Sequence, residues 1–92
     1  MSDELLIGSV VRVEEHPGAR APSLLLAVDL GTYGVEDVVL ATGGYEPEEL
    51  NDRQVVCRRD DAGAVIIAAH SHGAGLVLLR PDREVEPGTI VS

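Results

Sequence analysis

The sequence predicts an all-β domain built as a small barrel or sandwich, and three observations support this. Turn signals rich in Gly and Pro recur at short intervals, and the runs between them are short and rich in Val, Leu and Ile. The chain is 45% hydrophobic but only 2% aromatic, so its core must consist mainly of aliphatic side chains, as the β-branched preference of strands allows. Its 92 residues correspond to one domain, residues 1–92.

The first two strands are the clearest elements. Residues 6–15 are expected to form the first strand, with Gly8 as a candidate bend, and residues 23–30 the second. Successive side chains of a strand point to opposite faces, so one set of residues in the second strand should face the core. That set is Leu24, Leu26, Val28 and Leu30.

The remaining elements follow in a regular order. Residues 35–42 and 54–58 predict a third and a fourth strand, separated by one helical turn at residues 47–50 that begins with Pro and two acidic residues. Residues 64–69 and 76–79 are further apolar runs, and the first is apolar on both faces, which predicts burial on both sides or a subunit contact. Five strands with a helical turn between the third and fourth match an oligonucleotide-binding (OB) barrel, and a small β-sandwich is the alternative.

Short motifs along the chain carry a resemblance to a known family. They are Ile7-Gly8, Pro17-Gly18-Ala19-Arg20-Ala21-Pro22, Asp29-Leu30-Gly31, Tyr45-Glu46-Pro47-Glu48-Glu49-Leu50, Pro81-Asp82 and Pro87-Gly88-Thr89. In this order, over residues 7–91, the chain resembles the tRNA-binding domain family of the OB fold, and within it the CsaA-type secretion chaperones. The resemblance implies binding of tRNA or another structured RNA, or of unfolded and preprotein clients.

One segment departs from the family pattern. Members carry a basic loop after the fourth strand, whereas here Cys57-Arg58-Arg59 leads at once into Asp60-Asp61-Ala62-Gly63. The shortened loop implies reduced nucleic-acid binding. The alternative function is a peptide- or protein-binding export chaperone without significant RNA binding.

Arginines supply most of the candidate RNA-binding residues. Arg53, Arg58 and Arg59 form the densest basic group, either as phosphate contacts or as surface residues paired with neighbouring Asp side chains. Arg12 and Arg20 flank the loop between the first two strands, which is an edge of the usual OB binding face. Tyr45 is a candidate stacking platform or a packing residue. The predicted RNA-binding set is therefore Arg12, Arg20, Tyr45, Arg53, Arg58 and Arg59.

Two apolar residues of the second strand lie outside its predicted core face. Leu25 and Ala27 are expected at a dimer contact or a peptide contact. A homodimer is also expected because a 92-residue chain buries only part of its surface alone.

No catalytic residue, cofactor or metal site is expected, and the chain is not predicted to be an enzyme. His70-Ser71-His72 lacks the third ligand of a metal site and the oriented base of an activated serine, so it predicts a polar loop. The single Cys57 excludes an internal disulfide and fits a reducing cytosol.

Charge and terminal composition suggest the environment. Sixteen acidic residues against seven arginines, with no lysine, give a net charge of −9. Such a surface is typical of a halophilic cytoplasm, where salt screens self-repulsion, although a GC-rich genome also favours Arg. The acidic N-terminus is unlike a signal peptide, and no apolar run approaches the ~20 residues that span a bilayer, so a cytoplasmic protein without membrane attachment is expected.

Overall fold

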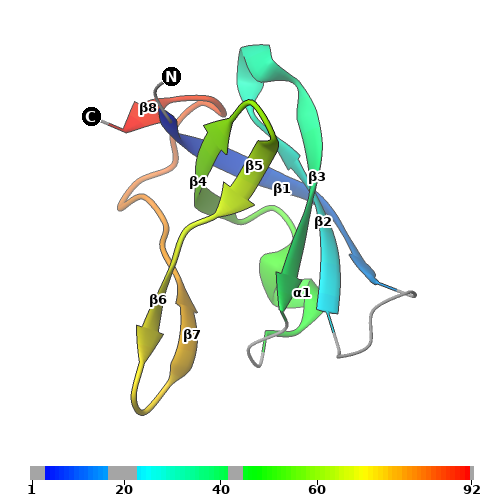
Figure 1. Ribbon diagram of the computed structural model, residues 1–92, viewed down its shortest axis with the longest axis vertical. Coiled ribbons are helices and arrows are strands. Elements are labelled where there is room, and N and C mark those ends of the chain that lie inside the picture. Colours follow the sequence, from blue (N-terminus) through cyan, green and yellow to red (C-terminus); the bar gives the residue numbers. More distant parts are fainter. Residues whose placement is uncertain (1–3, 17–22, 42–44, 92) are drawn as a thin grey trace.

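The computed structural model describes residues 4–16, 23–41 and 45–91, and Figure 1 shows their arrangement. Within this part of the chain lie eight strands, one 3₁₀ turn and one short helix. In order they are β1 (Glu4–Glu15), β2 (Ser23–Asp29), η1 (Gly31–Tyr33), β3 (Val35–Ala41), α1 (Pro47–Leu50), β4 (Gln54–Asp60), β5 (Gly63–Ile66), β6 (Ala68–Ser71), β7 (Gly75–Leu78) and β8 (Ile90–Val91).

The principal sheet curls into a nearly closed barrel. Its strands follow the order β3-β2-β1-β4-β5 with antiparallel pairing, β8 adds to the beginning of β1, and β3 and β5 lie against one another where the sheet meets itself. Five strands with α1 between β3 and β4 are the arrangement of an OB barrel. The predicted fold class is therefore confirmed.

Strand β1 is long because it serves two neighbours. Its first half pairs with β4 and its second half with β2, and the register with β2 shifts between Val10 and Arg12. The bulge leaves Val11 on the outside of the barrel, 49% exposed. Gly8, expected as a bend, has a different role. A side chain there would collide with Val28, so the missing Cβ makes room for the core.

Aliphatic side chains fill the barrel. Alternation along β2 points Leu24, Leu26 and Val28 inward, and Leu30 follows them, each no more than 3% exposed, as predicted. The other members of the core are Leu6, Val10, Val38, Leu40, Leu50, Val55, Cys57 and Leu78.

Helix α1 supplies Leu50 to this core. Pro47 stands at its first turn, and the backbone N–H of Glu46 donates to Oε1 of Glu49 at 2.9 Å, which satisfies one group at the helix start. The short helix therefore begins and ends where the sequence predicted.

The apolar run at residues 64–69 does not form one strand. Ile67 interrupts it by donating its N–H to the carbonyl of Val56 at 2.9 Å, and β6 then pairs with β7 as a separate hairpin that projects from the barrel (Figure 1). Burial on both faces is not found within the chain, since Val65 is 45% exposed. Of the two outcomes predicted for this run, only a subunit contact stays open.

Three of the motifs that carry the family resemblance, Ile7-Gly8, Asp29-Leu30-Gly31 and Pro87-Gly88-Thr89, meet at one joint. The N–H of Ile7 donates to the carbonyl of Thr89 at 2.8 Å, and the N–H of Gly88 donates to the carbonyl of Ile7 at 2.7 Å. Gly31 and Gly88 have φ of 68° and 87°, and a Cβ on Gly88 would lie 2.6 Å from the Leu30 carbonyl oxygen. Glycine is required because two backbones touch in left-handed conformations.

Candidate binding surfaces

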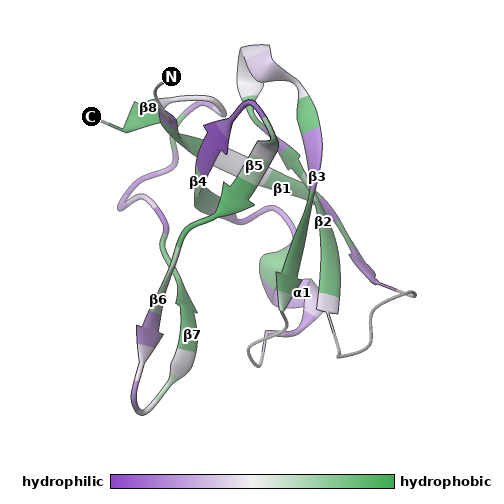
Figure 2. Cartoon of the chain, viewed as in Figure 1, coloured by the Kyte–Doolittle hydropathy of each residue, from purple (hydrophilic) through white to green (hydrophobic). Residues whose placement is uncertain are grey.

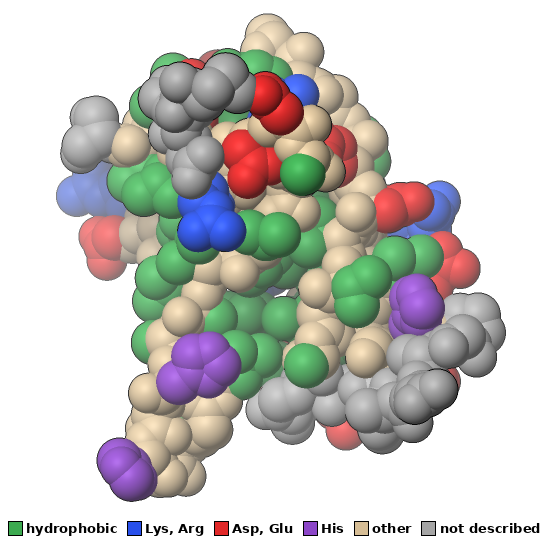
Figure 3. Space-filling model, in the orientation of Figure 1, with side chains coloured by type: hydrophobic (Ala, Val, Ile, Leu, Met, Phe, Trp, Pro, Cys, Tyr) green, Lys and Arg blue, Asp and Glu red, His purple; other side chains and the backbone are tan. Residues whose placement is uncertain are grey.

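The three arginines predicted as one basic group lie on different parts of the barrel. Arg58 and Arg59 are adjacent in β4, so their side chains point to opposite faces. Arg53 precedes β4, and six residues of extended chain separate it from Arg59 by about 20 Å. Figure 3 shows acidic and basic side chains interspersed on the face in view. Proximity in sequence has not produced a continuous basic patch.

Arg59 is held by side chains of the same chain. Its Nε donates to Oε2 of Glu36 at 3.1 Å, and its guanidinium carbon lies 4.4 Å from the centroid of the Tyr33 ring. The Tyr33 hydroxyl in turn donates to Oε2 of Glu4 at 2.7 Å. That hydrogen bond raises the pKa of Tyr33, because the phenol must keep its proton to donate. The charge of Arg59 is thus compensated before any ligand arrives.

Arg12 is also paired, on the outside of the barrel. Its Nε lies 3.0 Å from Oε1 of Glu14, and both side chains are more than half exposed. Exposed pairs of this kind contribute only about 0–1 kcal/mol to stability. Arg12 is therefore available to an incoming anion at small cost, although a carboxylate already stands beside it.

Arg53 and Tyr45 lie near each other. The guanidinium carbon is 5.9 Å from the ring centroid, and Arg53 forms no ion pair among the residues that the structure describes. The Tyr45 hydroxyl accepts the backbone N–H of Leu78 at 3.0 Å, and the ring packs partly against the core. Tyr45 thus joins the base of the β6–β7 hairpin to the barrel, while Arg53 stands beside its ring.

Arg59 does not pair with the acidic residues that follow it in the sequence. The sequence suggested pairing with Asp60 and its neighbours, but Oδ1 of Asp60 accepts the N–H of Ala62 at 2.8 Å in the turn between β4 and β5. Glu36, reached across the barrel from β3, takes the place of those neighbours. Arg20, the remaining predicted RNA contact, lies outside the described residues.

The two residues predicted at a contact on the outward-facing side of β2 differ in their exposure. Leu25 is half-buried, whereas Ala27 is only 4% exposed because it lies between Arg12 and Asp37 on the neighbouring strands. Leu25 has surface to offer a partner, and Ala27 has almost none.

The exposed valines around Leu25 were not singled out from the sequence. Val35 and Val39 of β3 are 58% and 57% exposed, and Val11 lies at the bulge of β1. The signal for β3 was present, because Val35, Asp37 and Val39 occupy alternate positions of a predicted strand and must share one face. The bulge at Val11 had no comparable signal.

An open groove of about 700 Å³ lies between the end of α1 and the chain after β7. Its lining is polar and carries charges of both signs. The lining residues are Asn51, Asp52, Arg53, Gln54, Arg80, Pro81, Asp82 and Glu84. The side-chain amide of Gln54 holds the loop after β7. Its Nε2 donates to Oγ of Ser9 and to the carbonyl of Val85, and its Oε1 accepts the N–H of Val85.

The remaining reactive side chains are isolated. His70 and His72 are exposed on the projecting hairpin, and no group of three potential metal ligands exists among residues 4–16, 23–41 and 45–91. Cys57 is buried in the core, and this burial raises the pKa of its thiol to about 11. No helix in the described part of the chain is long and apolar enough to cross a membrane.

Known proteins with similar structures include chaperones of one family. No protein-family model matches the chain. Chaperone CsaA from Bacillus anthracis str. Ames shares 30% identity with a TM-score of 0.87, over 98% of this chain and 91% of that one. A CsaA chaperone protein from Picrophilus torridus is 20% identical with a TM-score of 0.91, over 99% and 92%. A MetRS-related protein from Pyrococcus horikoshii is 19% identical with a TM-score of 0.77, over 98% and 90%.

The two more distant structures support the fold alone. The relative from Bacillus anthracis goes further, because its identity extends over nearly the whole of both chains. The motifs that meet at the joint between β1, η1 and the chain before β8 agree with this assignment. The chain therefore belongs to the CsaA family of OB-fold, tRNA-binding-domain proteins.

Proposed function

We propose that the chain is a CsaA-type chaperone that holds unfolded polypeptide segments, and that it binds RNA only weakly. The observation that carries this proposal is the exposure of aliphatic side chains outside the barrel, with Val11, Val35 and Val39 each about half exposed or more. Exposed apolar groups of this kind suit contact with apolar segments of another polypeptide. The relative from Bacillus anthracis is described as a chaperone.

Charge argues against strong RNA binding. The chain carries a net charge of −9, and two of its candidate phosphate contacts, Arg12 and Arg59, already have carboxylate partners. Affinity for a phosphate backbone depends on cations that release counterions from the nucleic acid. Arg59, which must leave Glu36 and the Tyr33 ring before it can bind a phosphate, contributes less to that affinity than Arg12, whose pair is exposed and weak.

The second candidate function is binding of tRNA or another structured RNA. Arg53, which has no ion pair among the described residues, stands beside the ring of Tyr45. A cation next to an aromatic ring is a combination that single-stranded nucleic-acid sites use. We propose that RNA binding is weak because the described surface offers few arginines that stand beside an aromatic ring without an ion pair.

We further infer a homodimer joined through a second apolar surface, here called the Leu5 face. Val91, Leu5, Arg58 and Val65 follow one another across β8, β1, β4 and β5, and the three apolar members are 39%, 38% and 45% exposed. Arg58 in the middle has an interaction partner within the chain. Val65 belongs to the run for which a subunit contact was predicted.

A client-aggregation experiment tests the chaperone proposal. A denatured enzyme is diluted into buffer, and its light scattering is followed with and without this protein. An equimolar amount of the protein should suppress most of the scattering. Absence of suppression even at a large molar excess would overturn the proposal. We expect no enzymatic turnover of the client, because the proposed activity is binding.

A parallel titration tests the RNA statement. Total tRNA is titrated with the protein in a gel-shift series at increasing KCl. We expect a dissociation constant in the non-specific range, about 10⁻⁴–10⁻⁶ M at physiological salt. Submicromolar, shape-selective binding that persists at molar KCl would contradict the expectation.

A further inference from the structure

The outer side of β1–β2–β3 combines apolar and acidic side chains in a regular pattern. We call it the acidic face, and its members are Val11, Arg12, Glu14, Leu25, Asp29, Val35, Asp37 and Val39. The cross-strand register places Glu14, Leu25 and Val39 in one row and Arg12, Ala27 and Asp37 in the next. Figure 2 shows hydrophilic residues at the far end of β1 and in the upper half of β3 beside hydrophobic stretches.

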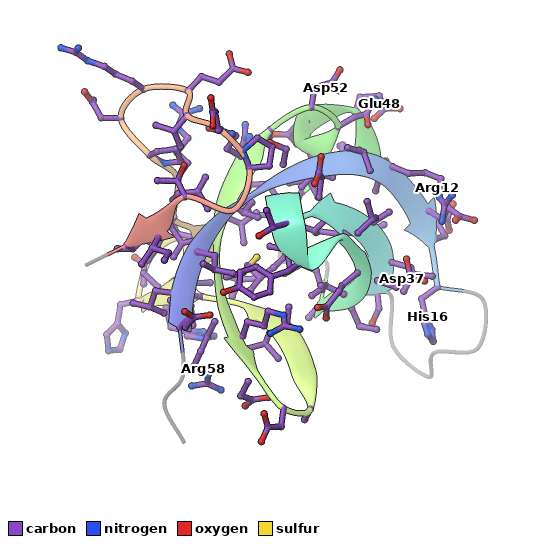
Figure 4. All side chains as sticks on the ribbon, turned by 90° about the horizontal axis from the view of Figure 1, so that it is seen from above. Arg12, His16, Asp37, Glu48, Asp52 and Arg58 are labelled. Atoms are coloured by element: carbon purple, nitrogen blue, oxygen red, sulfur yellow. The ribbon has the colours of Figure 1, made fainter. Side chains whose placement is uncertain are left out.

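Negative charge dominates this face. Three carboxylates accompany one guanidinium, and that guanidinium, of Arg12, is already held by Glu14. Asp29 accepts the N–H of Gly31 at 2.9 Å, whereas Asp37 has no ion pair within the described part of the chain. In Figure 4 the side chains of Arg12 and Asp37 lie on the same side of the barrel, away from Arg58. The Asp37 carboxylate is therefore available to pair with a cation of a bound partner.

The spacing along β3 specifies which segments would fit. Val35, Asp37 and Val39 occupy alternate positions, so their side chains point outward at intervals of about 7 Å. An extended polypeptide has the same repeat on each of its faces. A segment with an apolar residue, a cation and a second apolar residue at alternate positions therefore matches two valines with an aspartate between them.

We propose that the acidic face binds extended polypeptide segments in which apolar residues alternate with Lys or Arg. The inference rests on the proposed chaperone function and names the class of client and the surface that receives it. The valines and Leu25 supply apolar contact, and Asp37 selects for positive charge. Clients rich in Asp or Glu are rejected, because their carboxylates would approach Asp37 and Glu14.

Charge also argues against a second copy of this chain as the occupant. A twofold interface places the same patch against itself, so the carboxylates of one acidic face would meet those of the other. Like charges placed together suppress such pairing. A cationic segment removes the repulsion that a second copy would create.

The test uses three fluorescent peptides with identical apolar residues and either Lys, Ser or Glu at the intervening outward positions. Binding to the full-length protein is measured by fluorescence anisotropy at low salt. The Lys peptide should bind about tenfold more tightly than the Glu peptide, since one close charge contact changes sign. Equal affinity for the Lys and Glu peptides would overturn the proposal.

Variants locate the site. Asp37→Asn should reduce the preference for the Lys peptide, and Asp37→Lys should reverse it. Val39→Ser should weaken binding of all three peptides, whereas Ile90→Ser should not, although Val39 and Ile90 are 57% and 59% exposed. All these side chains are at the surface, and circular dichroism verifies that each variant is folded. An unchanged peptide affinity in Val39→Ser, or an equal loss in Ile90→Ser, would place the contact elsewhere.

Two further readouts separate the possible failures. If the protein suppresses client aggregation but Val39→Ser suppresses it equally well, the acidic face is not the site and the chaperone proposal stands. If the unchanged protein suppresses nothing, the chaperone proposal fails, and the peptide titration still decides what the face binds. If Val39→Ser converts a dimer into a monomer in light scattering, the face is a subunit contact and the inference is wrong.

Discussion

The barrel presents two apolar surfaces that differ in their charges. On the acidic face, Val35 and Val39 flank Asp37, which has no ion pair among the described residues. On the Leu5 face, Leu5 and Val65 flank Arg58, which has a partner within the chain. Both surfaces belong to one continuous sheet, and β1 contributes to each.

This difference indicates that apolar exposure alone does not determine what a surface binds. The central row of the Leu5 face holds a single charged side chain, Arg58, between apolar neighbours, and this side chain already has an interaction within the chain. Burial removes the solvation of an unpaired carboxylate, and this cost is offset only when a cation arrives with the partner. We therefore propose that the Leu5 face mediates self-association and that the acidic face binds clients.

The largest effect, a loss of stability, is expected for a substitution at the joint that supports the Leu5 face. Gly88→Ala would force a side chain into a left-handed backbone position, 2.6 Å from the Leu30 carbonyl oxygen. We expect stability to fall by about 2–3 kcal/mol, from backbone strain and displacement of the neighbouring chain. For a domain of this size the melting temperature should fall by roughly 10 °C or more, measured by circular dichroism.

The same variant separates the two faces. Gly88 and Thr89 hold the turn that brings β8 to β1, so dimer formation should weaken while the acidic face, supported by β2 and β3, keeps its peptide affinity below the melting temperature. Gly73→Ala is the matched control, because nothing lies within 4 Å of a Cβ there. Equal destabilisation by the two changes would contradict this account of the joint.

A pair of charge insertions compares the faces directly. Val65→Arg places a cation beside Arg58 on the Leu5 face and should convert the dimer into a monomer at micromolar concentration, as measured by light scattering. Leu25→Arg adds the same charge to the acidic face and should leave the dimer intact. A monomer formed by Leu25→Arg but not by Val65→Arg would put the subunit contact on β2.

The sequence allowed the barrel to be predicted because its strand signals are local. Alternation in β2, the turn glycines and Pro47 each depend on a few neighbouring residues. The split between β5 and β6 could not be predicted in this way. It depends on Ile67 donating to Val56 from another strand, and Ile67 continues the same apolar run.

The candidate sites were harder to predict because they depend on contacts across strands. Arg59 is paired by Glu36, which is 23 positions away, and not by the aspartates that follow it. The family motifs do not help here, because Gly31, Gly88 and Tyr45 hold the fold together. A resemblance carried by such residues predicts the fold well and says little about which ligand the outer surface receives.

Salt should stabilise the whole protein, weaken binding at the acidic face and leave the Leu5 face unchanged. The Debye length falls from about 30 Å at 0.01 M to about 3 Å at 1 M salt, so self-repulsion at a net charge of −9 is screened. We expect the melting temperature to rise by several degrees from dilute buffer to molar KCl, on the order of 1 kcal/mol of added stability. Over the same series the Lys peptide should lose affinity for the acidic face, whereas the dimer should be retained.

A flat melting temperature over that range would argue against adaptation to a saline cytoplasm. An affinity for the Lys peptide that rises with salt would indicate that its contact is purely apolar. In that case Asp37 would not select the client. Differential scanning calorimetry and anisotropy, measured in the same buffers, distinguish these outcomes.

The smallest effects are expected for RNA. Replacing Arg20, Arg58 and Arg59 together with Ala should lower an already weak tRNA affinity and flatten its salt dependence by about one unit for each phosphate that is no longer neutralised. The single changes sharpen the comparison, because Arg53 has no ion pair among the described residues whereas Arg59 is held by Glu36 and lies over the Tyr33 ring. Arg53→Ala should therefore change the slope more than Arg59→Ala. An equal change in both would mean that RNA displaces Glu36 from Arg59, and that binding is strong enough to break an existing pair. The weak-binding proposal would then be wrong, and the internal pairing of arginines would not be what limits RNA affinity.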